Sequence, residues 1–176
     1  GVAIEGLAGD DQNKVTVEAN EIADAVLYYG SDASFERARS IVIVQVKYSK
    51  AAELKPFRAA DAKKTLGKFA NSYSAYKRRH GMKQASEKLR FELVTNRPIL
   101  DELNEALRGL ILGTALHGTA KTQAAQVKTA CKLDGQDLIE FVSRLQLTGL
   151  TGDLREAKHQ LAVSLADWSP ARDPMA

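Results

Sequence analysis

The stretch Ser40 to Tyr48, with the sequence SIVIVQVKY, decides the fold class of this chain. Its four consecutive β-branched residues, Ile41 to Val44, are typical of a strand that is buried on both faces. Gln45 and Lys47 then interrupt the apolar run, and because side chains alternate along a strand, both project from the same face. A lysine and an amide are costly in an apolar strand unless they meet partners or a cavity. The stretch therefore indicates a site as well as a strand.

A second apolar stretch, Ile22 to Tyr29, carries a carboxylate at Asp24 and reads as another strand, ended by a turn. If the two strands pair, Asp24, Gln45 and Lys47 converge on one face of a sheet. Magnesium prefers oxygen ligands and activates water for phosphodiester hydrolysis, and a lysine can neutralise the charge that develops on the phosphate. The main-chain carbonyl of Val46 is a further candidate ligand. The alternative is a partly buried ion pair between Asp24 and Lys47.

Periodicity predicts the remaining elements. Apolar residues at three- and four-residue steps predict an amphipathic helix from Ala59 to Arg79, with lysines on its outer side. Alternation predicts a third strand from Leu89 to Thr95, and a short strand is expected near residues 15–18. Helical spacing after Pro98 predicts four helices, over residues 99–111, 121–132, 135–145 and 154–168. The fold class is therefore α/β, with a mixed sheet, a flanking helix and a helical C-terminal region.

Length and composition bound the class of protein. A chain of 176 residues with 44% hydrophobic content is long enough for one globular domain with a core. It contains no apolar run of about 18 residues, so no membrane span is predicted. Cys131 is the single cysteine and there is no CxxC pair, which indicates a reducing, cytoplasmic setting without a zinc site. The start at Gly1 lacks a secretory signal, and we expect the chain to be a piece of a longer protein.

Charge is distributed unevenly along the chain. Fifteen Lys or Arg residues stand against three acids between Arg37 and Arg90, whereas ten stand against nineteen elsewhere. Such a basic segment is typical of a surface that meets a polyanion, although a merely solvated helix would have the same composition. The candidate nucleic-acid contacts in this segment are Lys50, Lys63, Lys64, Lys68, Lys77, Arg78 and Arg79.

The order of these features resembles a known superfamily. An acidic residue in one strand, followed about twenty residues later by an apolar strand ending in (D/E/Q)xK, then a helix and another strand, is similar to the PD-(D/E)xK nucleases. The stretch IVIVQVKYS resembles the QxK branch, found as the N-terminal endonuclease domain of bacterial antiviral effectors of the STAND NTPase or CBASS type. FELVTNRPI and LDGQDLIEFVSRLQL are also similar to that group. The resemblance covers most of the chain and is strongest from Ala23 to Ile99.

The resemblance implies both a fold and a site. The fold would be a restriction-endonuclease-like mixed sheet flanked by helices. Asp24 would be the metal-binding acid, Gln45 the substitute for the usual second acid, and Lys47 the catalytic lysine. Glu5 would match an additional acid, and Gln45 and Val46 would complete the oxygen ligands of Mg²⁺, for which Mn²⁺ can substitute. Because Gln45 removes one charge from the site, metal affinity depends on a further acid such as Glu5.

The resemblance also implies an organisation and an activity. Residues 1–100 would form the nuclease core, 101–168 a helical extension, and 169–176 a linker toward a downstream sensor or NTPase module. The expected activity is endonuclease cleavage of double-stranded DNA with little sequence specificity, by a cytoplasmic antiphage protein that is a homo-oligomer when active. Two alternatives stay open. One is a catalytically degenerate module that binds nucleic acid or assembles protomers, and the other is an RNase on the same fold.

Overall fold

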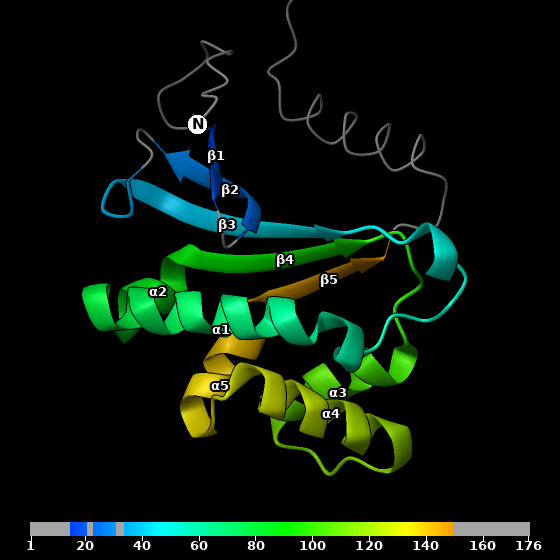
Figure 1. The fold of residues 1–176 in the computed structure, drawn as a ribbon. Helices are drawn as coiled ribbons and strands as arrows, with labels where there is room; N and C mark the ends of the chain where they lie inside the picture. Colours follow the sequence, from blue (N-terminus) through cyan, green and yellow to red (C-terminus); the bar gives the residue numbers. More distant parts are fainter. Residues whose placement is uncertain (1–14, 21–22, 31–33, 150–176) are drawn as a thin grey trace, which may run out of the picture.

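A mixed β-sheet with helices on one side forms the described part of the molecule (Figure 1). The structure is a computed structural model that describes residues 15–20, 23–30 and 34–149. The sheet order is β1-β2-β3-β4-β5; the β1–β2 and β2–β3 pairs are antiparallel, and the β3–β4 and β4–β5 pairs are parallel. The α/β prediction is confirmed. The strands are β1 (Val15–Asn20), β2 (Ala23–Gly30), β3 (Ala38–Lys47), β4 (Leu89–Thr95) and β5 (Leu145–Gly149).

Helix α1 lies directly against the sheet and carries the pattern that its sequence predicts. Its buried side chains include Leu66, Phe69 and Tyr73, while Lys63 and Lys64 are exposed. Within the described part of the chain, no helix combines the length and the apolar surface needed to cross a bilayer. The helices are α1 (Ala59–His80), α2 (Met82–Lys88), α3 (Asp101–Leu112), α4 (Gly118–Cys131) and α5 (Gly135–Val142), with a short 3₁₀ helix, η1 (Lys50–Ala52).

The core joins the sheet to the helices that follow it. The ring of Phe91 on β4 lies 5.2 Å from that of Phe69 on α1 and 5.4 Å from that of Phe141 on α5, between ring centroids. All three rings are buried, and they belong to one hydrophobic cluster. Residues on both sides of position 100 thus contribute to the same core.

Strand β3 is buried on one face and partly exposed on the other. Ile41 and Ile43 are buried beneath the helices, but the side chain of Val46 on the opposite face is 51% exposed. The expectation that this strand is buried on both faces is therefore wrong. The reason is that the helices of the described residues all cover one side of the sheet (Figure 1).

The helix predicted over residues 135–145 ends earlier, at Val142. Residues Leu145–Gly149 instead form β5, which pairs in parallel with β4. This pairing joins segments far apart in the chain, and helical spacing in one segment does not reveal it. Helix α2 was likewise not predicted, whereas the strand near 15–18 and the helices near 99–111 and 121–132 are confirmed with shifted bounds. The helix expected over 154–168 lies outside the described residues.

Candidate active site at the end of strand β3

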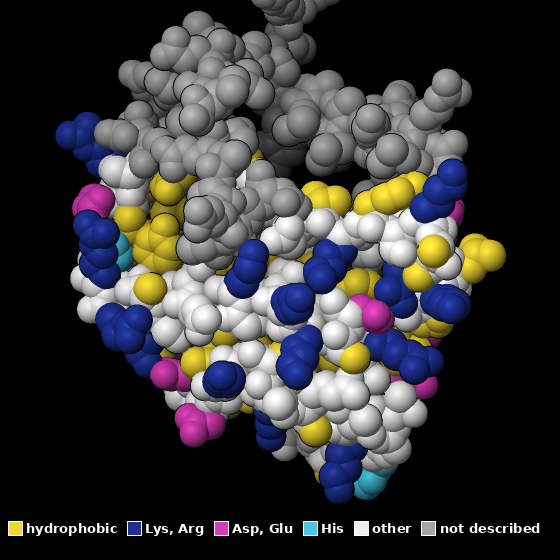
Figure 2. Space-filling model, viewed as in Figure 1, with side chains coloured by type: hydrophobic (Ala, Val, Ile, Leu, Met, Phe, Trp, Pro, Cys, Tyr) yellow, Lys and Arg dark blue, Asp and Glu magenta, His cyan; other side chains and the backbone are white. Residues whose placement is uncertain are grey.

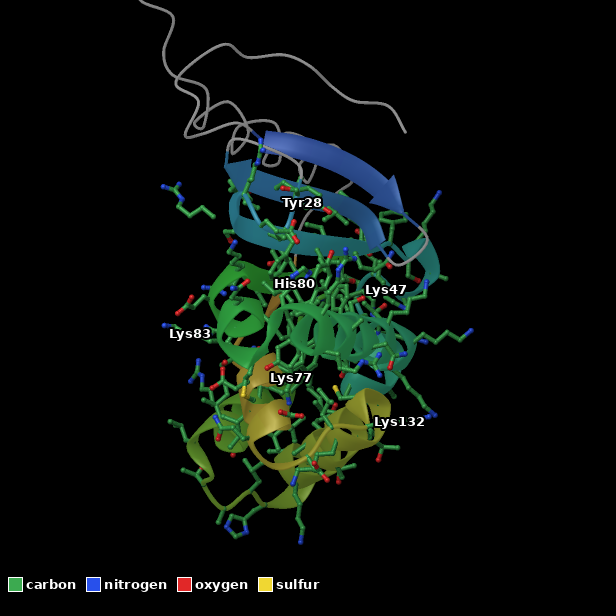
Figure 3. All side chains as sticks on the ribbon, turned by 90° about the vertical axis from the view of Figure 1, so that its left-hand side faces the viewer. Tyr28, Lys47, Lys77, His80, Lys83 and Lys132 are labelled. Carbon is green, nitrogen blue, oxygen red and sulfur yellow. The ribbon has the colours of Figure 1, made fainter. Side chains whose placement is uncertain are left out.

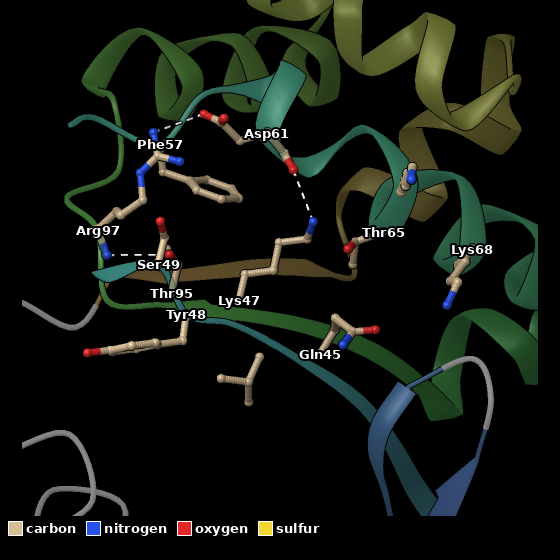
Figure 4. A pocket seen from close by; sticks show the side chains of 12 residues that line it. Gln45, Lys47, Tyr48, Ser49, Phe57, Asp61, Thr65, Lys68, Thr95 and Arg97 are labelled. Carbon is tan, nitrogen blue, oxygen red and sulfur yellow. Dashed lines mark hydrogen bonds and ion pairs between the residues drawn. The ribbon is translucent and has the colours of Figure 1, made fainter. Parts of the chain in front are cut away.

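A pocket of about 540 Å³ opens between the C-terminal end of β3 and the first half of α1. Gln45 and Lys47 line it from the strand, and Lys64, Thr65 and Lys68 line it from the helix (Figure 4). Gln45 and Lys47 lie on the same face of β3 as the buried Ile41 and Ile43. The apolar half of that face packs under α1, and the polar half lines the pocket. The structure thus brings together the two β3 residues that alternation predicts to share a face.

Lys47 reaches the start of α1. Its Nζ donates a hydrogen bond to the main-chain oxygen of Asp61, at 3.2 Å. Because this acceptor belongs to the helix backbone, the position of the ammonium depends on where α1 begins. Figure 4 shows the lysine side chain crossing the pocket from strand to helix.

The carboxylate of Asp61 fixes that helix start. Its Oδ2 accepts hydrogen bonds from the main-chain N–H of Arg58, at 2.9 Å, and from Nη2 of Arg97, at 3.1 Å. A carboxylate in the first turn also interacts favourably with the helix dipole. Arg97 further donates to the main-chain oxygens of Lys55 and Pro56, each at 2.8 Å. One arginine therefore ties the segment before α1 to the end of β4.

Further contacts hold Arg97 and the loops around the pocket in place. The guanidinium carbon of Arg97 lies 5.2 Å from the centroid of the buried Phe57 ring, a cation–π contact. Beside it, Asn96 exchanges two hydrogen bonds with the backbone of Ser49, from Ser49 N to Oδ1 at 3.0 Å and from Nδ2 to Ser49 O at 3.3 Å. Asn96 directly follows β4 and Ser49 lies two residues after β3, so these hydrogen bonds hold the loops after the two strands together.

Sequence reasoning missed this support. It interpreted Asn96-Arg97-Pro98 only as the signal that ends a strand, and it assigned no role to Asp61. Polar residues directly after a buried strand were the available signal, since such residues lie at the edge of a sheet where sites form. Their partners lie 36 or more residues away in sequence, so only the folded chain identifies them.

The pocket is electropositive. Four cations line it, against one carboxylate, and that carboxylate is already paired with Arg97. Figure 2 shows lysine and arginine side chains spread over this face of the molecule, with few acidic ones among them. A phosphate group is the kind of ligand that such a pocket attracts. The four cations are Lys47, Lys64, Lys68 and Arg97.

The backbone of Asp24 lies at the same end of the sheet. Ala25 on β2 pairs with Val44 on β3, so Asp24 and Gln45 are the next positions along this antiparallel ladder. The side chain of Asp24 and the whole of Glu5 lie outside the described residues.

No protein-family model matches the chain, and no curated protein matches it.

Magnesium would find part of its ligand set here. The amide oxygen of Gln45 and the main-chain oxygen of Val46 are hard donors, but both are neutral, and magnesium sites usually include one or two carboxylates. Among the described residues, no three His, Cys, Asp or Glu side chains form a group that could hold a metal ion. The sequence predicts Asp24 as the carboxylate of this set, and its backbone is next in register to Gln45.

The other predicted nucleic-acid contacts lie outside this pocket. Lys50 and Lys63 are exposed, in η1 and on α1. Lys77 forms an ion pair with Asp137 of α5, which offsets its charge. Arg78 and Arg79 are exposed near the C-terminal end of α1, about 20 Å along the helix from Lys64 at 1.5 Å per residue.

Proposed function

We propose that this chain is a magnesium-dependent nuclease that hydrolyses phosphodiester bonds of double-stranded DNA in the pocket between β3 and α1. One observation carries the proposal: Gln45 and Lys47 line one cationic pocket at the end of the sheet where the backbone of Asp24 lies next in register. Carboxylate and amide oxygens together with an ammonium group are a set that suits metal-assisted phosphodiester hydrolysis.

Each group has a distinct role in this proposal. Lys47, held by the main-chain oxygen of Asp61, neutralises charge on the phosphate at the scissile bond. Lys64 and Lys68 bind the backbone on either side, without reading its sequence. Asp24, Gln45 and the Val46 carbonyl would hold the metal. Magnesium, when bound, polarises the phosphoryl oxygen and lowers the pKa of water.

The topology supports the same proposal. Three antiparallel strands are followed by α1 and then by β4, which is parallel to β3. That order agrees with the strand, strand, helix, strand arrangement on which the resemblance to PD-(D/E)xK nucleases depends. The antiviral role, the downstream module and the cytoplasmic location stay predictions of that resemblance.

A second candidate is a module that binds nucleic acid without cutting it. Asp61, the one carboxylate that the described residues place in the pocket, is bound by Arg97 and by the N–H of Arg58. Such a module would use the pocket cations alone. It predicts binding that weakens with salt but does not depend on magnesium.

Cleavage of plasmid DNA separates the two candidates. The wild-type protein would be assayed with magnesium and with EDTA over a range of protein concentrations, with a folded RNA in parallel. The variants are Asp24→Asn and Lys47→Met, and the control is Lys83→Met, because Lys83 is exposed on α2 and lies on the opposite side of the molecule from Lys47 (Figure 3).

The nuclease proposal expects magnesium-dependent cutting that falls about 100-fold or more in both site variants and is unchanged in the control. Cutting of the RNA alone would assign the same site to an RNase. DNA binding without any cutting, equal in magnesium and EDTA, would overturn the enzyme in favour of the binding module.

A further inference from the structure

Helix α4 presents a basic flank that the proposed active site does not use. Its sequence, GTAKTQAAQVKTAC, contains no acidic residue. Lys121, Lys128 and the next residue after the helix, Lys132, are all exposed. Their spacings of seven and four residues put them along one side of the helix. A lysine stripe of this kind is stronger than scattered surface charge because nothing on its own helix offsets it.

The same flank borders a groove. A cavity of about 410 Å³ lies between α3 and α4, and Lys121 and Lys128 form one wall of it. Thr114 also lines the cavity and adds a hydroxyl, and Gly113 has open space beside its backbone, where a ligand can approach. Within the described residues, the lining includes no Asp or Glu, and neither lysine forms an ion pair.

Helix α4 is fixed relative to the active-site pocket. The helices approach so closely that a Cβ atom on Gly67 of α1 would lie 3.2 Å from the main-chain oxygen of Ala130 on α4. At the start of α1, the N–H of Ala59 donates a buried hydrogen bond to Oε1 of Gln123 on α4, at 2.9 Å. The lysines on α4 and the pocket lysines of α1, Lys64 and Lys68, are therefore carried by one packed pair of helices.

Both sets of cations face the same way. Figure 3 shows Lys47 and Lys132 on one side of the molecule and Lys83 on the other. Figure 2 shows that the face with α1 and α4 carries lysine and arginine side chains across both helices. The pocket and α4 lie on opposite sides of α1 (Figure 1). A helix with its side chains is about 10–12 Å across and packed helices lie about 8–10 Å apart, so the span from the pocket to the α4 lysines is roughly 20 Å. At 3.4 Å per base pair, that span matches about six base pairs of duplex.

We infer that Lys121, Lys128 and Lys132 form a second contact site for the backbone of the nucleic acid whose scissile phosphate occupies the pocket. This inference rests on the proposed function, because the same molecule fills both sites. The lysines contact phosphates and read no bases, so the second site adds affinity without sequence preference. A duplex shorter than the span reaches only the pocket.

Binding measured by fluorescence anisotropy in EDTA, where no cutting occurs, tests the second site. The ligands are a duplex of about 24 base pairs and a hairpin with a stem of about three base pairs, which is half the span, each titrated over a range of salt. The test variant is Lys121→Ala/Lys128→Ala/Lys132→Ala in the whole chain. Lys128→Glu and Lys83→Glu form a matched pair, since both change the net charge equally while only one alters α4. Thermal unfolding verifies that each variant folds.

We expect the triple variant to bind the long duplex about tenfold more weakly and to lower its salt slope by roughly three, while hairpin affinity stays within about twofold. Lys128→Glu should weaken long-duplex binding far more than Lys83→Glu. The second site would be overturned if the triple variant kept the wild-type affinity and salt slope for the long duplex while Lys64→Ala/Lys68→Ala bound that duplex more weakly. That result would leave the proposed function standing. Unchanged binding in both variants would overturn the proposed function as well.

Discussion

Nζ of Lys47 lies 3.2 Å from the main-chain oxygen of Asp61, which joins the end of β3 to the first turn of α1. A main-chain acceptor depends on the course of the helix rather than on a side chain. The carboxylate of Asp61 is engaged separately, by Arg97 and the N–H of Arg58, and it fixes where that helix begins. One residue thus positions the lysine through its backbone and the helix through its side chain.

Lys47→Met should separate chemistry from stability. The substitution removes one hydrogen bond from a partly exposed side chain, so the free energy of unfolding should change by no more than about 1 kcal/mol. Cleavage should fall about 100-fold or more, since the charge at the phosphate is lost. Urea denaturation and plasmid cleavage measure the two quantities. A loss of several kcal/mol with normal activity per folded molecule would make Lys47 a structural residue only.

Arg97→Lys should weaken the frame around the pocket. The Arg97 side chain is 11% exposed, and lysine cannot reproduce its fork of donors to Lys55 O, Pro56 O and the Asp61 carboxylate. We expect the free energy of unfolding to fall by about 1–3 kcal/mol. Chemical denaturation measures this, with Arg79→Lys on the exposed end of α1 as the control. Equal stability of the two variants would show that the Arg97 contacts contribute nothing net.

Phe141→Ala should destabilise the sheet and the helices together, because they share one hydrophobic core. The ring is fully buried against Phe91 on β4, so its removal should cost about 3–5 kcal/mol. Because one core contains both residues, circular dichroism and tyrosine fluorescence should report a single shared transition. Leu112→Ala, at a side chain that is 72% exposed, is the control and should change stability by about 0.5 kcal/mol or less. Two separate transitions would support a domain boundary near residue 100.

Cys131 should make stability fall at alkaline pH. Burial raises the pKa of its thiol from 9.0 to about 12. Above about pH 9 the unfolded chain releases the thiol proton while the folded chain keeps it, so the unfolded state binds fewer protons and stability decreases with pH. The decrease reaches about 1.4 kcal/mol per pH unit below the folded pKa. Unfolding free energies of wild type and Cys131→Ala between about pH 8 and pH 10.5 isolate this contribution. Parallel profiles for the two proteins would contradict it.

Much of the local structure follows from short-range patterns. The β-branched run from Ile41 to Val44 predicts β3, and the three- and four-residue steps predict α1, because alternation and helical periodicity are properties of neighbouring residues. The same alternation puts Gln45 and Lys47 on one face. Strand β5 (Leu145–Gly149) was not predicted for the opposite reason, since a strand of five residues exists only through its partner β4.

The sequence by itself determined the α/β class, the principal strands and helix, and the pair Gln45 and Lys47, since all of these depend on spacings of a few residues. The tertiary structure alone shows that Arg97 and Asp61 frame the pocket and that Lys132, directly after α4, lies on the same side of the molecule as Lys47 (Figure 3). Those relationships join residues 36 or more positions apart. They arise when core packing brings distant segments together, and periodicity within one segment carries no trace of that packing.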